Sequence, residues 1–108
     1  MNISDLSAVK TYNLKTLGDT ILVPPIESHK KLVLIAIIIN TKGASSNVIK
    51  IYDSTEAIGK DPNRLKATLD TATSLGRFEY GFPCFDGIYL SCETGTAPDV
   101  TVIYADTQ

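Results

Sequence analysis

Eight consecutive apolar residues, at positions 32–39, constrain the fold of this chain more than any other feature. The run reads Leu-Val-Leu-Ile-Ala-Ile-Ile-Ile, and five of its residues are β-branched, which favours a strand over a helix. It is too short to cross a bilayer as a helix, which needs about 20 such residues. A strand that is apolar on both sides must be covered on both sides. The cover is either the rest of the domain or another subunit, and we therefore expect a homo-oligomer.

The length and charge of the chain set further limits. The 108 residues are expected to form one domain, with residues 1–6 as an N-terminal arm and 106–108 as a C-terminal tail. A net charge of −2 leaves no excess positive charge to bind nucleic acid, and no polybasic tract indicates a membrane surface. The first residues, Met-Asn-Ile-Ser-Asp-Leu, lack the regions of a signal peptide, so we expect folding in a cytoplasm.

Short apolar or alternating segments, separated by turn residues, follow one another along the chain. This pattern predicts an all-β fold: a single-domain antiparallel β-sandwich, either jelly-roll or Greek-key-like. Pro24-Pro25 and Pro83 are expected to end strands, and Asp86-Gly87 to close a tight hairpin. About eight strands are expected, at 8–14, 20–23, 32–40, 48–52, 65–71, 77–82, 88–93 and 100–105.

Two groups of side chains are assigned to the interior. Phe78, Tyr80 and Phe82 alternate with polar residues, and aromatics at this period usually fill a sandwich core. Cys84 and Cys92 are expected to be reduced side chains in or near the core. A hairpin at Asp86-Gly87 would place Cys84 opposite Tyr89, and this register disfavours a disulfide.

The sequence offers little chemistry for catalysis. His29, beside Ser28 and Lys30, is the chain's one histidine and is expected in a loop, without evidence for a catalytic triad. The carboxylates are scattered over turns and strand faces, and nothing specifies the close pair that glycosidase chemistry requires. One histidine cannot complete a common zinc ligand set. We therefore predict that the protein is not an enzyme and has no catalytic, cofactor or metal residues.

Three binding hypotheses remain as alternatives. Asp53, Glu56, Asp61 and Asn63 lie in and beside one polar loop and could form a calcium site, although they lack the EF-hand spacing. Tyr12, Phe85 and Tyr89 are the aromatics that could face outward and bind carbohydrate. Lys30-Lys31 and Lys42 flank the apolar run, but no interleaved aromatics support nucleic-acid binding there.

Several motifs, in order, resemble those of small virion proteins of tailed bacteriophages. The matching features are a strand ending in Tyr-Asp, a Gly-aromatic-Glu-Tyr strand, an Asp-Gly-Ile-Tyr strand and a final Asp-Val-Thr-Val strand. The resemblance covers roughly residues 32–104, and its motifs lie at 47–54, 65–71, 76–83, 86–90 and 96–104.

The resemblance implies a non-enzymatic structural protein of the phage particle. The favoured role is a capsid decoration (cement) protein that binds the major capsid protein as a small homo-oligomer, often a trimer, and so is located in the virion. The alternative is a carbohydrate- or receptor-binding β-sandwich module on a phage tail or fibre. Neither role involves nucleic acid or a membrane as the partner.

Overall fold

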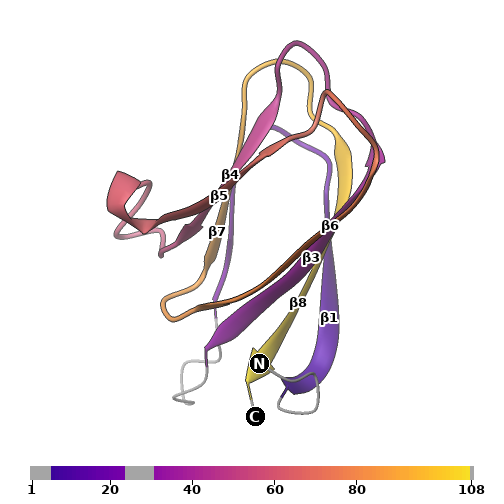
Figure 1. Ribbon diagram of the computed structural model, residues 1–108. Coiled ribbons are helices and arrows are strands. Elements are labelled where there is room, and N and C mark those ends of the chain that lie inside the picture. Colours follow the sequence, from indigo (N-terminus) through magenta and orange to yellow (C-terminus); the bar gives the residue numbers. More distant parts are fainter. Residues whose placement is uncertain (1–5, 24–30, 108) are drawn as a thin grey trace.

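The computed structural model describes residues 6–23 and 31–107 of the chain (Figure 1). Within these residues the chain forms antiparallel strands and one short 3-10 helix, η2. The elements are β1 (Leu6–Leu14), β2 (Gly18–Leu22), β3 (Leu32–Thr41), β4 (Val48–Asp53), η2 (Pro62–Arg64), β5 (Leu65–Asp70), β6 (Gly76–Cys84), β7 (Ile88–Glu93) and β8 (Asp99–Thr107).

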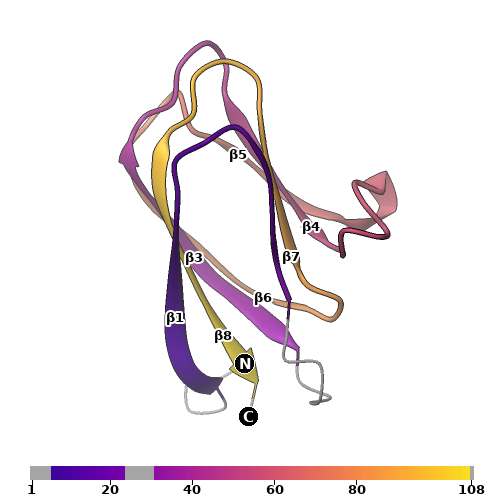
Figure 2. The ribbon, with the colours of Figure 1, turned by 180° about the vertical axis from the view of Figure 1, so that it is seen from behind.

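The strands form two four-stranded sheets that face each other (Figures 1 and 2). One sheet has the order β1-β8-β3-β6 and the other β2-β7-β4-β5, and every pairing is antiparallel. Successive strands alternate between the sheets, apart from β4 and β5, which are adjacent in one sheet. This is the order of a jelly roll, so the all-β sandwich predicted from the sequence is confirmed.

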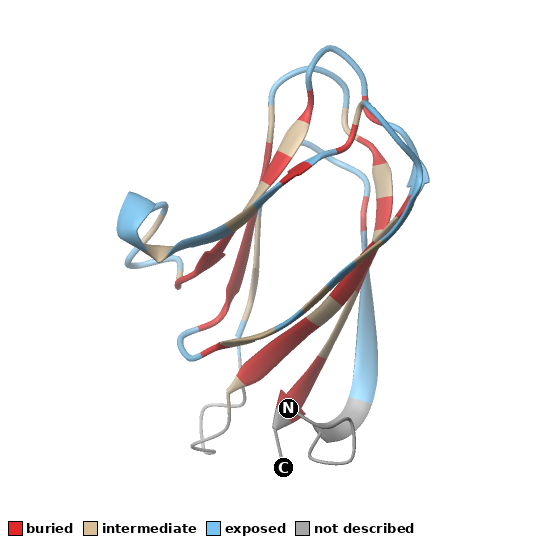
Figure 3. Cartoon of the chain, in the orientation of Figure 1, coloured by how far each residue is buried: buried red, intermediate tan, exposed pale blue. Residues whose placement is uncertain are grey.

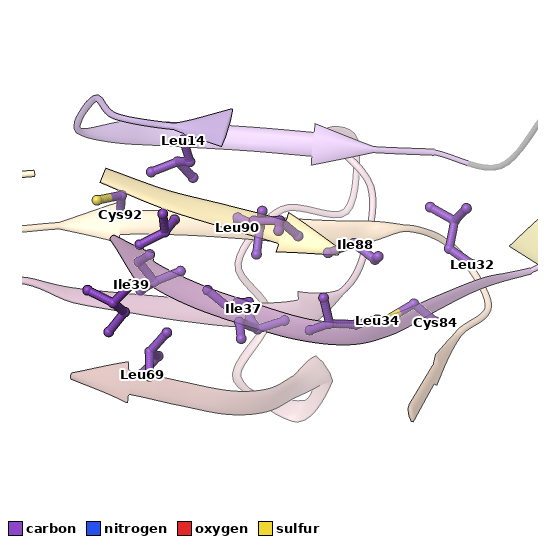
Figure 4. Close-up of a cluster of buried hydrophobic side chains, with 14 residues drawn as sticks. Leu14, Leu32, Leu34, Ile37, Ile39, Leu69, Cys84, Ile88, Leu90 and Cys92 are labelled. Carbon is purple, nitrogen blue, oxygen red and sulfur yellow. The ribbon is translucent and has the colours of Figure 1, made fainter. Parts of the chain in front are cut away.

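The core lies between the two sheets and is built from the residues that alternate inward along each strand (Figure 4). β3 contributes Leu32, Leu34, Ile37 and Ile39, and the registers set these against partners on β6 and β8. The predicted aromatic stripe of β6 packs at the margin of this cluster. The buried members are Leu14, Leu32, Leu34, Ile37, Ile39, Ile49, Ile51, Leu69, Cys84, Ile88, Leu90, Cys92, Val100 and Val102.

The hairpin predicted at Asp86-Gly87 is wrong. β6 pairs with β3, whereas β7 pairs with β2 and β4, so this connection crosses from one sheet to the other. The crossing is tight: a Cβ on Gly87 would lie 2.8 Å from the carbonyl oxygen of Ser54 and 2.9 Å from that of Leu22. Glycine is needed at this position because the backbones approach so closely.

Pro83 does not end its strand as predicted. β6 continues through Pro83 to Cys84, and Pro83 lies opposite Val33. Because β6 is at the edge of its sheet, a residue without an N–H is tolerated there. A register shift between Leu34 and Ala36 marks a bulge opposite this strand, and Gly81 has a φ of 84°, in the left-handed region that glycine adopts easily.

The expected arm and tail are shorter than predicted. β1 begins at Leu6, and β8 runs to Thr107, so Asp106 and Thr107 are strand residues. Their register with neighbouring strands explains this: Leu6 lies opposite Thr107, and Asp106 lies opposite Leu32. Residues 1–5 and 108 lie outside the described part of the chain.

Candidate interaction surfaces

The residues considered for catalysis fall outside the described part of the chain, and the candidate metal ligands are not brought together within it. His29, Ser28 and Lys30 lie outside the described residues, as does Pro24-Pro25. Among residues 6–23 and 31–107 no group of three or more histidine, cysteine or acidic side chains is arranged to hold a metal ion. No helix in that part of the chain is long and apolar enough to cross a membrane.

Asp53, one of the candidate calcium ligands, makes its contacts with the backbone. Its buried carboxylate accepts hydrogen bonds from the backbone N–H groups of Phe85 at 3.0 Å, Asp86 at 2.8 Å and Gly87 at 3.5 Å. Asp61 similarly accepts from the N–H of Asn63 at 3.0 Å and caps η2. Both carboxylates therefore stabilise chain turns in this structure.

The motif that begins at Asn47 also has a structural explanation. The Asn47 side chain is fully buried and donates hydrogen bonds to the carbonyl oxygens of Glu93 at 3.1 Å and Thr94 at 2.8 Å. The oxygen of the same side-chain amide accepts a hydrogen bond from the Thr71 hydroxyl at 2.6 Å. Asn47 thus ties three connections together at one end of the sandwich, and its burial is compensated by these bonds.

Both cysteines are free and buried, as predicted. Burial raises the pKa of the Cys84 thiol to about 12, and burial likewise raises that of Cys92. A thiol is a nucleophile only as the thiolate, so both groups are inert at neutral pH.

The three candidate carbohydrate-binding aromatics divide into two kinds. Phe85 is 63% exposed and Tyr12 is 39% exposed, and the Lys31 ammonium lies 4.7 Å from the Phe85 ring centre. Tyr89, by contrast, is buried: its ring packs edge-on against Tyr52, with centres 5.9 Å apart, and its hydroxyl donates to Asp19 at 2.7 Å. The expectation that Tyr89 is available on the surface is wrong, because its neighbours on β2 and β4 cover it.

The outer side of the β1-β8-β3-β6 sheet has an apolar stretch along its two central strands, β8 and β3. This stretch is bordered by Thr11 of β1 and by Arg77 and Glu79 of β6. β3 and β8 alternate along their registers, so one set of side chains faces the core and the other faces away from it. Ala36 and Ala105 are fully buried here, and Ile38 and Ile103 are partly buried (Figure 3). We call this surface the apolar face; its residues are Val9, Val33, Ile35, Ala36, Ile38, Ile103 and Ala105.

The outer side of the β2-β7-β4-β5 sheet carries more polar side chains along its central strands, β7 and β4. Lys50 lies opposite Ser91 and Thr68, and Val48 lies opposite Glu93 and Asp70. The Lys50 ammonium is 3.9 Å from the Glu93 carboxylate. This is the ordinary alternation of an antiparallel sheet with one face in water, and the contrast singles out the apolar face.

A second surface feature is an open hollow of about 610 Å³ beside β2. It is lined by Ile21 and Val23 on one side and by Thr55, Glu56 and Ala57 on the other. The Thr55–Ala57 side is held by a helical turn, in which the Gly59 N–H donates to the Thr55 carbonyl oxygen at 2.8 Å. No sequence pattern indicated that this turn would lie next to β2, because residues far apart in the chain form the hollow.

Comparison with known proteins gives a fold match but no family. No protein-family model matches the chain, and no curated protein sequence matches it. The crystal structure of the Drosophila NLP core, solved to explain pentamer formation and histone binding, has a similar fold. Its TM-score is 0.61 and its sequence identity is 12%; the match covers 94% of this chain and 100% of the other.

This match corrects the function expected from the sequence. A histone-binding protein that forms pentamers points away from a capsid decoration protein, from a phage tail or fibre module and from a location in the virion. Pentamer formation agrees with the expected homo-oligomer, but the solved structure binds histones rather than a major capsid protein. Two residues of the motifs behind the phage resemblance, Asp53 and Asn47, make hydrogen bonds that join separate connections of the chain.

Proposed function

We propose that this chain is a non-enzymatic protein-binding module that works as a homo-oligomer. The apolar face carries this proposal. Ile38 and Ile103 expose part of their surface on a sheet whose central strands are apolar on both sides. Contiguous apolar surface of this kind marks a protein–protein interface, because leaving it in water is unfavourable by roughly 25 cal/mol per Å².

A second copy of the chain is the partner that best fits the apolar face. Four of the five charged side chains on the described strands of this sheet are paired within the chain: Lys10 with Asp106 at 2.8 Å, and Arg77 with Glu79. Asp106 holds the pKa of Lys10 above its usual range through its bond to the ammonium. The fifth, Asp99 at the start of β8, accepts a hydrogen bond from the Asn13 side chain at 2.7 Å. Most of the charge on this sheet is therefore compensated within the chain and does not select a partner of opposite sign. The pentamer formation described for the solved structure of similar fold supports self-association.

We take the proposed binding partner from the same solved structure, because the protein in that structure binds histones. Histones are therefore the first ligands to test with the oligomer. Binding would be measured with purified histones and the wild-type protein, with cytochrome c as a control of similar positive charge. Equal binding of both would indicate a general attraction to basic proteins and would contradict specific recognition of a partner.

The experiment for self-association is light scattering with native mass spectrometry on wild type, Ile38→Lys and Ile103→Lys. Wild type is expected to be an oligomer at micromolar concentration, and each variant a folded monomer, because a lysine cannot be buried there without a partner. Val48→Lys is the matched control, since Val48 is also partly buried but lies on the polar sheet. Ile38→Thr, which keeps the β-branch, tests the same site with less risk to folding. A monomeric wild type, or variants that stay oligomeric, would contradict the proposal.

A further inference from the structure

The strands β5 and β6 form one side of the sandwich. They are the outermost strands of the two sheets, and residues 71–75 join them directly, so both lie on the same side of the molecule (Figure 1). β1 and β2 are the outermost strands on the opposite side. Between β5 and β6 the margin of the core therefore reaches the surface.

Apolar side chains line the margin between β5 and β6. Phe78, Tyr80 and Phe82 pack against the core and are only partly buried, as is Ala67 of β5. Leu75, in the connection that joins the two strands, is 56% exposed. We call this surface the edge patch; its residues are Ala67, Leu75, Phe78, Tyr80 and Phe82. Like the apolar face, the edge patch is unfavourable in water and marks a site of contact.

The two apolar surfaces lie on different parts of the molecule, the apolar face on the outside of one sheet and the edge patch on the side of the sandwich. Two copies joined face to face would bury both apolar faces and leave both edge patches in water. A head-to-tail contact, in which the apolar face of one copy meets the edge patch of the next, covers both surfaces with a single kind of contact.

The charges beside the two surfaces are complementary. Asp99, which begins β8 beside the apolar face, accepts hydrogen bonds from the neutral amides of Asn13 at 2.7 Å and Asn40 at 3.4 Å, and it makes no ion pair with a described residue. Lys66 of β5 likewise makes none. Burial raises the pKa of the Cys84 thiol of β6 and the positive charge of Lys66 lowers it, so Lys66 lies near β6 and the edge patch. A head-to-tail contact can therefore bring a free anion to a free cation.

We propose that the homo-oligomer assembles head to tail, with the apolar face of each copy on the edge patch of the next and Asp99 of the first copy beside Lys66 of the second. Ile38 and Ile103 then pack against the aromatic rings of the edge patch. Each copy uses two different surfaces, so the contact repeats from copy to copy and closes into a ring when its rotation divides a full turn. This inference rests on the proposed self-association and identifies the second surface that it requires.

Native mass spectrometry and light scattering test the edge patch directly. Tyr80→Lys should be a folded monomer at micromolar concentration, because the contact would bury its ammonium, whereas a free surface lets the ammonium reach water. Tyr104→Lys is the matched control, since Tyr104 is also a partly buried tyrosine at the core margin but lies on β8. Leu75→Lys tests the edge patch at an exposed position with less risk to folding, and Leu17→Lys, at a 50% exposed position between β1 and β2, is its control. Both controls should assemble like wild type.

Mixing two defective variants tests which surfaces meet. Ile38→Lys lacks a working apolar face but keeps its edge patch, and Tyr80→Lys is the reverse. The mixture should form dimers with one copy of each, which their masses identify, whereas neither variant dimerises alone. Because such a dimer lacks the closing contacts of a ring, it is sought at concentrations up to about a hundredfold above those at which wild type assembles. The absence of mixed dimers would overturn the head-to-tail contact.

A charge exchange tests how the two copies are oriented. Lys66→Glu and Asp99→Lys should each weaken assembly by about threefold or more, and the double variant should assemble more tightly than either. A double variant as weak as the weaker single variant would contradict the placement of Asp99 beside Lys66.

The same measurements separate this inference from the proposed self-association. If Tyr80→Lys and Leu75→Lys stay oligomeric while Ile38→Lys is a monomer, the apolar face associates with another surface and the edge patch is wrong. A monomeric wild type would contradict both proposals.

Discussion

At the scale of single residues, Asp53 shows what a sequence pattern can and cannot convey. The sequence indicated that Asp53 follows an apolar strand and precedes a polar loop. These two features made it a candidate calcium ligand. Its actual partners, the N–H groups of Phe85, Asp86 and Gly87, are more than thirty positions away. No local pattern encodes such a contact, because it depends on how two sheets are connected.

Replacing Asp53 is expected to destabilise the fold. Asp53→Ala removes the acceptor of these hydrogen bonds and should lower the free energy of unfolding by about 1–3 kcal/mol. Asp61→Ala, which removes an exposed cap on η2, should cost about 1 kcal/mol or less. Urea denaturation followed by circular dichroism measures both. If calcium raised the melting temperature of wild type but not of Asp53→Ala, Asp53 would be a metal ligand and the structural role would be wrong.

At the scale of strands, alternation in the sequence predicted the elements well but their neighbours poorly. The inward positions of β4, β5 and β7 follow from period-two apolar residues such as Ile49 and Ile51. The hairpin at Asp86-Gly87 failed because a turn signal does not tell whether the next strand pairs locally or crosses to the opposite sheet. Pro83 was misread because its tolerance depends on β6 being an edge strand, which is a property of the whole sheet.

The edge strand β2 pairs with β7 along Gly18–Leu22, and the hydrogen bond from the Tyr89 hydroxyl to Asp19 adds to this pairing. This bond lowers the pKa of Asp19 and raises that of Tyr89 to about 12. The Asp19 contribution to stability is therefore present above the ordinary aspartate pKa of 3.8 and is lost as the pH falls through the lowered value. The Tyr89 contribution is present below pH 10 and is lost as the pH rises from 10 to about 12.

Tyr89→Phe is expected to lower the unfolding free energy by about 1 kcal/mol at pH 7. The difference from wild type should shrink as the pH falls below 3.8 and through the lowered pKa of Asp19, and again as the pH rises above 10. Tyr52→Phe, which keeps the ring packed against Tyr89, is the control. Urea denaturation across this pH range gives the free energies, and hydrogen exchange should show faster exchange of the β2 amides in Tyr89→Phe. If the difference in unfolding free energy stayed constant with pH, packing of the ring, rather than the hydrogen bond to Asp19, would account for the loss of stability.

At the scale of the whole molecule, the apolar run that forms β3 connects sequence to assembly. Its two-sided apolar pattern predicted that both faces need cover. The inner face receives it from the other sheet, through Leu90 and Ile51 among others. The outer face is only partly covered within the described chain, as Ile38 shows. The strand pattern left the jelly roll and the Greek key as alternatives. The strand order and the position of the hollow could not be predicted, because both depend on long-range pairings that no segment specifies alone.

Self-association through the apolar face should couple oligomer formation to folding stability. For a monomer the melting temperature does not depend on protein concentration, whereas for an oligomer that dissociates on unfolding it rises with concentration. Over a roughly hundredfold range of protein concentration, the melting temperature of wild type should rise by several degrees. The melting temperature of Ile38→Lys should be lower and should not change with concentration. Val48→Lys should keep the concentration dependence of wild type, since it leaves the apolar face intact. Differential scanning calorimetry measures all three. A wild-type melting temperature that stays constant over this range would mean that the folded chain does not depend on a second copy, and that the apolar face is stable in water.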